Sequence, residues 1–183
     1  DNDFSGVFIM NLIKAFEGGN KRFLVLCPED KNRYEENLDA NLLAVKRFDY
    51  FYPKSFQSIA YGLGIVENLK FNPIIILQLP FFFLFFFINA VKLSRKVDVL
   101  WSHWLLPGGL IGSLVSRVSR RKHFITVHSN GGFYFFRHFP FARRILGFIM
   151  SNSETVFVVS HKLRKEIIEL IKNKEECLIS KIK

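Results

Sequence analysis

Polar side chains that could bind a ligand follow three apolar, strand-like runs of the sequence. His103 ends the first run, His128 ends the second, and Ser160 with His161 follows the third. In open α/β sheets, ligands bind outside the carboxyl ends of the strands. We therefore expect these side chains to line one edge of a crevice.

The residues after His128 strengthen this expectation. Ser129 and Asn130 precede two glycines, Gly131 and Gly132. A polar, glycine-containing loop at a strand end is suited to hydrogen-bonding the hydroxyl groups of a ligand. A lone histidine is ordinarily a satisfied core or surface residue, so this loop is what favours a functional interpretation of His128.

A second candidate feature lies in the sequence DVLWSHWLLPGGLIG, residues 98–112. Pro107 and the two glycines after it predict the start of a helix, where free N–H groups and the helix dipole favour an anion. Gly108 and Gly112 are four residues apart in this sequence, which would let the helix approach the sheet closely.

Two tryptophans flank the first histidine in the same segment. Core packing explains Trp101 and Trp104 when each is considered alone. Taken together with His103 and the predicted helix start, the whole constellation favours a ligand site.

The sequence contains none of the motifs that would assign a different chemistry. It has no G-x-x-x-x-G-K-[ST] phosphate loop, no G-x-S-x-G nucleophile elbow, no H-E-x-x-H zinc motif and no complete G-x-G-x-x-G fingerprint. Cys27 and Cys177 show no C-x-x-C or zinc-ligand spacing. We therefore expect unpaired thiols in a reducing compartment.

The candidate residues need a scaffold that alternates strands and helices, and the sequence predicts one. Near-continuous apolar runs, typical of parallel strands covered on both faces, alternate with helical patterns. The predicted strands are residues 22–28, 42–50, 97–103, 123–128 and 155–160, and the predicted helices are residues 5–16, 107–120, 140–151 and 160–172. This order indicates an α/β domain with a doubly wound parallel sheet and right-handed crossovers.

Composition indicates a folded domain with an anionic partner. Hydrophobic residues make up 49% and charged residues 23% of the 183 residues, which excludes a disordered chain. The formal net charge of +10 favours membrane lipid, nucleotide, lipid phosphate or nucleic acid as a partner. Nucleic acid is the weakest of these, because the phenylalanines are massed in one run and do not alternate with basic residues as stacking platforms.

That run is PIIILQLPFFFLFFFINAV, residues 73–91. If fully helical it would be about 28 Å long, close to a bilayer core of roughly 30 Å, but Pro80 breaks or starts a helix within it. Lysines and arginines flank both ends. Three interpretations remain open: a buried helix under the sheet, a helix lying in a membrane interface, and a true membrane span.

Several segments, in this order and spacing, resemble the N-terminal half of GT-B glycosyltransferases of family four. DFSGVFIMNLIKA resembles the family's loop and first helix, AVKRFDYFYP its V-x-R-F-x-Y-x-P strand, and IAYGLGIVENLKFNP its Y-G-x-G-i-x-x-N-l segment. DVLWSHWLLPGGLIG resembles D-v-i-h-a-H-W-x-x-P-x-G-l, FITVHSN resembles t-x-H-G-x-D, and ETVFVVSHKLRKEI resembles d-x-V-x-x-V-S-x-x-l-x-x-x-l. The resemblance covers nearly all 183 residues.

The resemblance implies a Rossmann-like domain that mainly binds the acceptor of a sugar transfer from a nucleotide-sugar donor. Carried over to this chain, it places Gly6 near the donor phosphates and His128 toward the transferred sugar as the catalytic residue. It implies no metal and no other cofactor. The residues that it assigns to acceptor binding are His103, Trp104, Ser129 and Asn130.

Two departures from the family pattern leave the acceptor open. The chain has His128-Ser129-Asn130 where the family often has His-Gly-x-Asp. It also has Ser5-Gly6 where the family has Gly-Gly.

We therefore predict the acceptor-binding half of a retaining, nucleotide-sugar-dependent glycosyltransferase that transfers hexosyl groups in polysaccharide or glycolipid synthesis at a membrane. The alternative is a non-catalytic, membrane-associated binding module with the same fold. A first strand and a C-terminal donor-binding domain are expected outside residues 1–183, so this single domain alone is expected to be inactive. The predicted partners are a UDP- or GDP-sugar, a sugar or lipid-linked acceptor and an anionic membrane surface. The predicted location is cytoplasmic, with attachment to the inner face of the plasma membrane left open.

Overall fold

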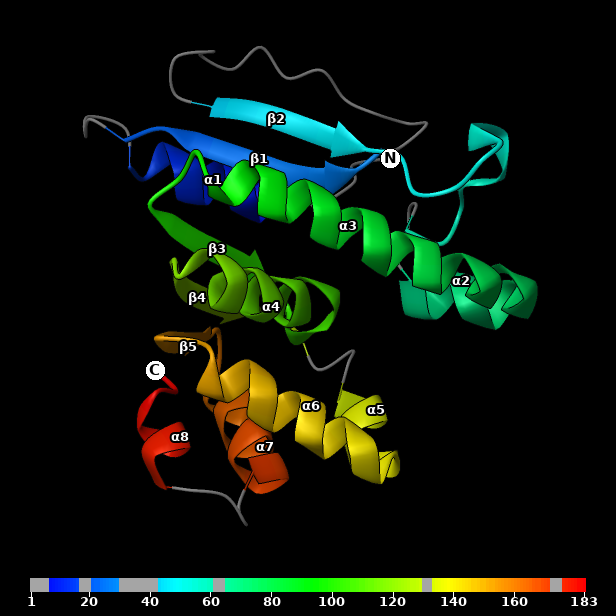
Figure 1. Cartoon of the computed structure of the whole chain (residues 1–183). Coiled ribbons are helices and arrows are strands. Elements are labelled where there is room, and N and C mark those ends of the chain that lie inside the picture. Colours follow the sequence, from blue (N-terminus) through cyan, green and yellow to red (C-terminus); the bar gives the residue numbers. More distant parts are fainter. Residues whose placement is uncertain (1–6, 17–20, 30–42, 61–64, 130–132, 172–175) are drawn as a thin grey trace. The chain divides into compact units, whose positions relative to one another are not determined.

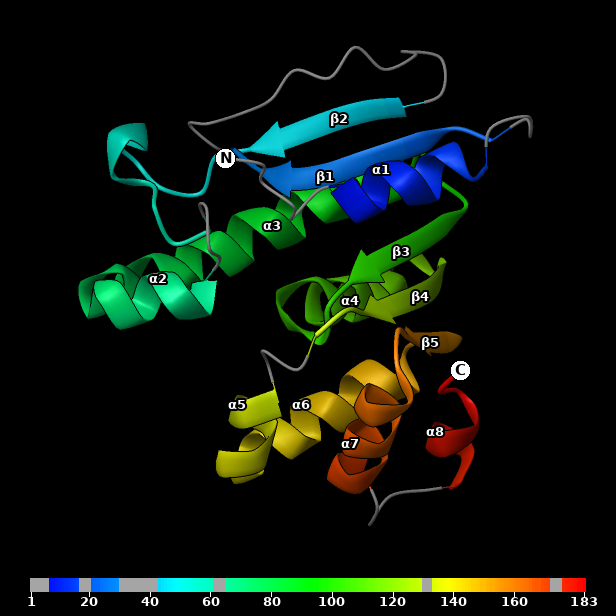
Figure 2. The same ribbon diagram turned by 180° about the vertical axis from the view of Figure 1, so that it is seen from behind.

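The computed structural model describes residues 7–16, 21–29, 43–60, 65–129, 133–171 and 176–183. These residues belong to two compact units, Asp1–Phe85 and Phe86–Lys183. Figures 1 and 2 show the elements of both units, and each unit is described here by itself.

The first unit is built on two parallel strands. Phe23 pairs with Leu43 at one end, and Pro28 pairs with Phe48 at the other. Apolar, β-branched and aromatic residues dominate both strands, as expected for sheet positions. The elements of this unit are α1 (Val7–Lys14), β1 (Phe23–Pro28), β2 (Leu43–Phe48), η1 (Lys54–Phe56), α2 (Ile65–Phe71), η2 (Pro73–Gln78) and the first part of α3 (Leu79–Ser94).

Aromatic side chains form the centre of the first unit. Phe48, Tyr50 and Phe82 are at most 3% exposed. The ring of Phe82 lies 5.9 Å from that of Phe48 and 5.2 Å from that of Tyr50, the latter edge-to-face. Aromatic pairs prefer such tilted or edge-to-face arrangements. One face of α3 is therefore packed on β2 and on the segment that follows it.

Gln78, a polar interruption of the phenylalanine-rich run, holds the loop after β2 in place. Its side chain is 6% exposed, and its Oε1 accepts hydrogen bonds from the N–H groups of Ser58 and Ile59. Its Nε2 donates to the carbonyl of Phe56 at 2.7 Å. Asn68 donates from the other side to the carbonyls of Ser58 and Ile59. Buried loop backbone needs such partners, which explains why polar residues stand in so apolar a sequence.

The second unit contains a three-stranded parallel sheet in the order β3-β4-β5. Between the first two strands, the pairing runs from Val99 with Lys122 to His103 with Thr126. Between the second and the third, it runs from Phe124 with Thr155 to Val127 with Val158. After the end of α3, its elements are β3 (Val99–His103), η3 (Leu105–Gly109), α4 (Leu110–Ser119), β4 (Lys122–Val127), α5 (Phe133–His138), α6 (Pro140–Ser151), β5 (Thr155–Val158), α7 (His161–Ile171) and α8 (Glu176–Ser180).

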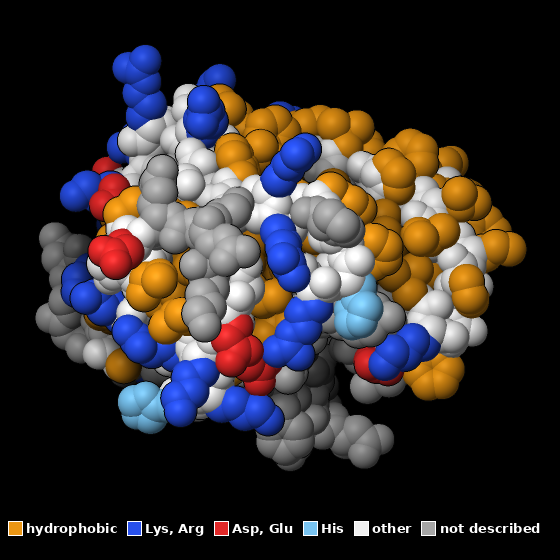
Figure 3. All heavy atoms as spheres, turned by 90° about the horizontal axis from the view of Figure 1, so that it is seen from below, with side chains coloured by type: hydrophobic (Ala, Val, Ile, Leu, Met, Phe, Trp, Pro, Cys, Tyr) orange, Lys and Arg blue, Asp and Glu red, His pale blue; other side chains and the backbone are white. Residues whose placement is uncertain are grey.

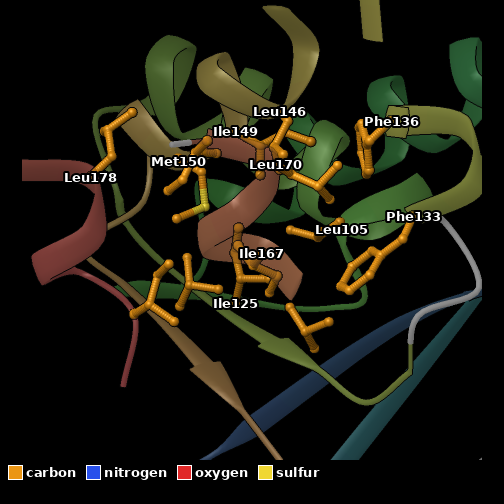
Figure 4. Packing of buried hydrophobic residues seen from close by; sticks show 14 of the residues in the cluster. Leu105, Ile125, Phe133, Phe136, Leu146, Ile149, Met150, Ile167, Leu170 and Leu178 are labelled. Atoms are coloured by element: carbon orange, nitrogen blue, oxygen red, sulfur yellow. The ribbon is translucent and has the colours of Figure 1, made fainter. Parts of the chain in front are cut away.

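The core of the second unit lies between one face of this sheet and its helices (Figure 4). Ile125 of β4, Leu146 and Ile149 of α6, and Ile167 of α7 are completely buried. Alternation along the strands turns Trp101 and Phe157 toward the other face, where each is 37% exposed. The buried face thus anchors the strands whose carboxyl ends carry the candidate residues.

The predicted α/β fold with parallel strands is confirmed. α1, α4, α6 and α7 coincide closely with the four helices expected from the sequence, whereas α2, α5 and α8 were not predicted. The strands are, however, divided between two sheets. A doubly wound sheet has two halves, and the chain completes one half before it begins the other. The last strand of the first half and the first strand of the second half are not neighbours in the sheet. β2 and β3 are two such strands, so we do not expect them to pair.

The phenylalanine-rich run forms η2 and α3, and Pro80 is the second residue of α3, as expected of a proline that starts a helix. The most apolar window of 18 residues within Pro73–Ser94 has a mean hydropathy of 2.4, and the stretch is long and apolar enough to cross a membrane by length and composition. Only 17% of its most apolar window is buried. The described structure therefore does not favour the interpretation as a buried helix.

Candidate functional site

The structure brings His103 and His128 into direct contact. His103 is the last residue of β3, and His128 directly follows β4, its parallel neighbour. Nδ1 of His103 lies 2.9 Å from Nε2 of His128. One of these nitrogens must donate and the other accept, so the two imidazoles take complementary tautomers. The prediction that strand ends bring these two side chains together is confirmed.

Burial keeps this histidine pair neutral. Desolvation, followed by the charge of His128, lowers the pKa of His103 to about 4. Desolvation also lowers the pKa of His128. At pH 7 the pair therefore offers neutral donors and acceptors, which suit hydroxyl groups better than they suit phosphate charges.

Tryptophan rings frame the histidine pair on two sides. The Trp101 ring is stacked with that of His103, with centroids 6.4 Å apart and planes 12° apart, and its Nε1–H donates to Oγ1 of Thr126. The Trp104 ring lies 5.6 Å from that of His128. Neither tryptophan is in the core: Trp101 is 37% exposed and Trp104 is half-buried. Apolar rings around a few polar groups are typical of small-molecule sites.

Trp104 has a strained backbone. Its φ of 62° and ψ of 154° lie in a region that residues with a Cβ rarely adopt, at a cost of about 1–3 kcal/mol. Two hydrogen bonds hold this conformation: its N–H donates to the carbonyl of Thr126 at 2.8 Å, and its carbonyl accepts from the N–H of Gly109 at 2.9 Å. Strain of this kind concentrates at functional sites.

The two glycines four residues apart allow the close approach that the sequence predicted. A Cβ on Gly108 would lie 2.5 Å from the carbonyl oxygen of His103. A Cβ on Gly112 would lie 2.2 Å from both Nε2 of His123 and Oγ of Ser102. The expectation of close packing between this helix and the sheet is confirmed.

One N–H group at the predicted anion site already has a partner. Leu106 has an extended backbone, with φ of −129° and ψ of 139°, so regular helix lies only after it, in agreement with a helix start at Pro107. The N–H of Gly109 donates to the carbonyl of Trp104, so it is not available to an anion. The N–H group of Gly109, which the sequence pattern assigned to a ligand, instead holds the turn at Trp104.

A second histidine contact, which sequence reasoning missed, lies under the site. Nε2 of His123 is 2.9 Å from Oγ of Ser102, and Nδ1 of His123 is 3.5 Å from Oγ of Ser113. His123 is 1% exposed, and desolvation lowers its pKa to about 4. The one signal in the sequence is Gly112, whose missing side chain makes room for the pair.

We expect acid to destabilise the protein through His123. Its pKa is 6.5 in the unfolded chain and about 4 in the folded one, so the unfolded chain takes up the proton first. The stabilisation is therefore complete above pH 6.5 and is lost as the pH falls toward 4, by about 3 kcal/mol. Urea unfolding at several pH values between 7.5 and 4.5 measures this loss. His123→Gln should reduce the slope without abolishing it, because the pKa values of His103 and His128 are also lowered in the folded protein. An unchanged slope in this variant would contradict the assignment.

The other predicted site residues are placed as follows. Ser129 is exposed, directly after His128. Ser160 does not join the histidine pair but caps α7, where its Oγ accepts from the N–H of Leu163 at 3.2 Å. Gly6 and Asn130 lie outside the described residues.

The comparison with protein families decides what kind of domain this is. The model of Glycosyltransferase Family 4 matches residues 5–176, a range that contains the histidine pair and both tryptophans. The chain belongs to glycosyltransferase family 4. The resemblance read from the sequence is thereby confirmed, and the parallel α/β structure is that of a Rossmann-like, N-terminal GT-B domain. A search of curated proteins gave no match.

The described part of this family 4 domain contains no group of three or more His, Cys, Asp or Glu side chains that could hold a metal ion. The expectation that transfer needs no metal stays a prediction.

Proposed function

We propose that this family 4 domain binds the acceptor in a retaining transfer of a hexosyl group from a nucleotide-sugar, in polysaccharide or glycolipid synthesis at a membrane. The observation that carries the proposal is the neutral His103–His128 pair beside Trp104, at adjacent strand ends of a family 4 domain. Sugar ligands present hydroxyl groups and apolar ring faces, and the site offers neutral imidazoles and an indole to match them.

In this proposal, His128 hydrogen-bonds the transferred sugar, and His103 fixes the orientation of the His128 ring. The 2.9 Å contact between the two rings ties the tautomer of His128 to that of its partner. A fixed imidazole reduces the cost of aligning the sugar for reaction. The residues that we assign to acceptor binding remain His103, Trp104, Ser129 and Asn130.

The donor is expected to bind mainly to protein outside residues 1–183, with Gly6 near its phosphates. We assign a UDP- or GDP-sugar as donor, a sugar or lipid-linked acceptor, no metal, and a cytoplasmic location at the membrane surface. The domain alone should therefore bind acceptor and transfer no sugar.

The test uses the natural full-length protein, incubated with a panel of UDP- and GDP-hexoses and with lipid and sugar acceptors. We expect nucleotide release that depends on an acceptor, a product with the anomeric configuration of the donor by NMR, and activity that persists in EDTA. Residues 1–183 alone should release no nucleotide. Sugar transfer by this domain alone would contradict the proposal. A full-length protein that binds acceptor but turns over no donor would also contradict it, and would favour the non-catalytic binding module.

A further inference from the structure

Exposed apolar side chains form a continuous feature of the first unit. They come from the end of α2, from η2 and from one face of α3, and their exposed fractions range from 39% to 79%. We call this feature the apolar surface; its residues are Phe71, Ile74, Leu77, Phe81, Leu84 and Phe85. Figure 3 shows hydrophobic side chains gathered on the right of that view, where α2 and the first part of α3 lie.

The periodicity of α3 aligns this surface with basic residues. Phe81, Leu84 and Phe85 are spaced three and four residues apart, and Lys92 follows Phe85 by two turns on the same helix face. Lys92 is exposed, and so are Arg95 and Lys96 directly after the helix. At the other end, Lys70 of α2 is exposed beside Phe71 but forms an ion pair with Glu67 at 2.7 Å. An apolar stripe with lysine and arginine at the end of α3 matches the two parts of an anionic lipid interface, acyl chains and headgroups.

The opposite side of the same segment is committed to protein contacts. Gln78 hydrogen-bonds the loop after β2, and Phe82 packs on Phe48 and Tyr50. A helix that crossed the bilayer would carry β2 and this loop into hydrocarbon, where the exposed Lys46 of β2 could not be solvated. The contacts therefore favour a helix that lies on the membrane over one that spans it.

We propose that the apolar surface docks the protein on an anionic lipid bilayer, with α3 lying in the interface and its basic end at the headgroups. The proposal rests on the membrane part of the proposed function for its biological meaning. Lipid binding is measured without any sugar donor, so its failure and a failure of sugar transfer are distinguishable.

The experiment is cosedimentation of the natural full-length protein with vesicles of phosphatidylcholine containing one quarter phosphatidylglycerol, compared with pure phosphatidylcholine. We expect strong binding to the anionic vesicles only, and release of the bound protein by alkaline carbonate. The triple variant Ile74→Gln/Leu77→Gln/Leu84→Gln should lower the partition coefficient by about tenfold or more, because three side chains no longer enter the acyl region.

The matched control for these substitutions changes three exposed apolar residues elsewhere. Val118→Gln/Phe141→Gln/Val159→Gln replaces side chains that are 53% to 62% exposed on the second unit, and it should bind as the wild type does. Thermal unfolding shows whether each variant is folded. Equal loss of binding in both triple variants would overturn the proposal.

Charge reversal tests the basic end of the helix. Lys92→Glu/Arg95→Glu/Lys96→Glu should lower binding to anionic vesicles by about a hundredfold or more, since each basic residue near the surface contributes about 1 kcal/mol, a factor of about five.

The control for this charge reversal is Lys162→Glu/Arg164→Glu/Lys165→Glu, which makes the same change in net charge on exposed residues of α7. It should retain binding. The proposal would be overturned by any one of three results. The wild type could fail to bind anionic vesicles, it could resist extraction by carbonate, or it could self-associate through this surface in place of binding lipid.

Discussion

Replacing His128 by alanine should lower the kcat of sugar transfer by about a hundredfold or more, with a smaller change in KM for the donor. The imidazole is held 2.9 Å from Nδ1 of His103 and is kept neutral by burial, which lowers its pKa. A preorganised hydrogen bond to the reacting sugar is strongest where charge develops, and removal of one such group typically costs a factor of roughly 100 to 1,000 in kcat. Steady-state kinetics of the full-length enzyme, with the donor identified in the panel assay, measure both constants.

His103 should act as a positioning residue for this reaction. His103→Ala removes the ring that orients His128 and should lower kcat by about tenfold. His103→Asn should recover part of the loss, because the asparagine amide can place a nitrogen near the position of Nδ1. His138→Ala, a substitution on an exposed histidine at the end of α5, serves as the control and should leave kcat unchanged. A His128→Ala enzyme with wild-type kcat would remove the histidine pair from the mechanism.

The histidine pair could be predicted from the sequence because it follows from topology. Parallel neighbouring strands end at the same edge of a sheet, so His103 and His128 meet once the two strands are identified. Ser160 also follows a strand, but its hydroxyl is used by the helix that begins there. A capping serine and a ligand-binding serine have the same sequence pattern, and only the structure distinguishes them.

Other parts of the site depend on contacts that no local pattern encodes. The turn at Trp104 has positive φ although the residue is not glycine, so residue preferences predict a different conformation. The pairing of His123 with Ser102 depends on where α4 lies against the sheet. The apolar surface likewise follows from the packing of Phe82 and Gln78, because a run that is apolar on all sides gives no indication of which side faces protein.

Gly112 determines how closely α4 packs on the buried His123–Ser102 pair, and its replacement by alanine tests that packing. A Cβ there would lie 2.2 Å from Nε2 of His123 and from Oγ of Ser102, a distance that no carbon tolerates. Either α4 moves away from the sheet or the hydrogen bond between the two side chains breaks. Overpacking costs about 1–3 kcal/mol, and a buried polar group without its partner costs about the same again.

We expect Gly112→Ala to lower the free energy of unfolding by about 3 kcal/mol, even though alanine is favoured over glycine within a helix by about 1 kcal/mol. Urea unfolding at pH 7.5 measures the change, and Val118→Ala, on the exposed side of the same helix, should change stability by less than about 0.5 kcal/mol. In a Ser102→Gly background the cost of Gly112→Ala should fall, because one of the two overlapping atoms is gone and the two sites are coupled. An equal cost in both backgrounds would show that the strain arises elsewhere, and a stabilised Gly112→Ala variant would mean that the helix does not need this close approach to the sheet.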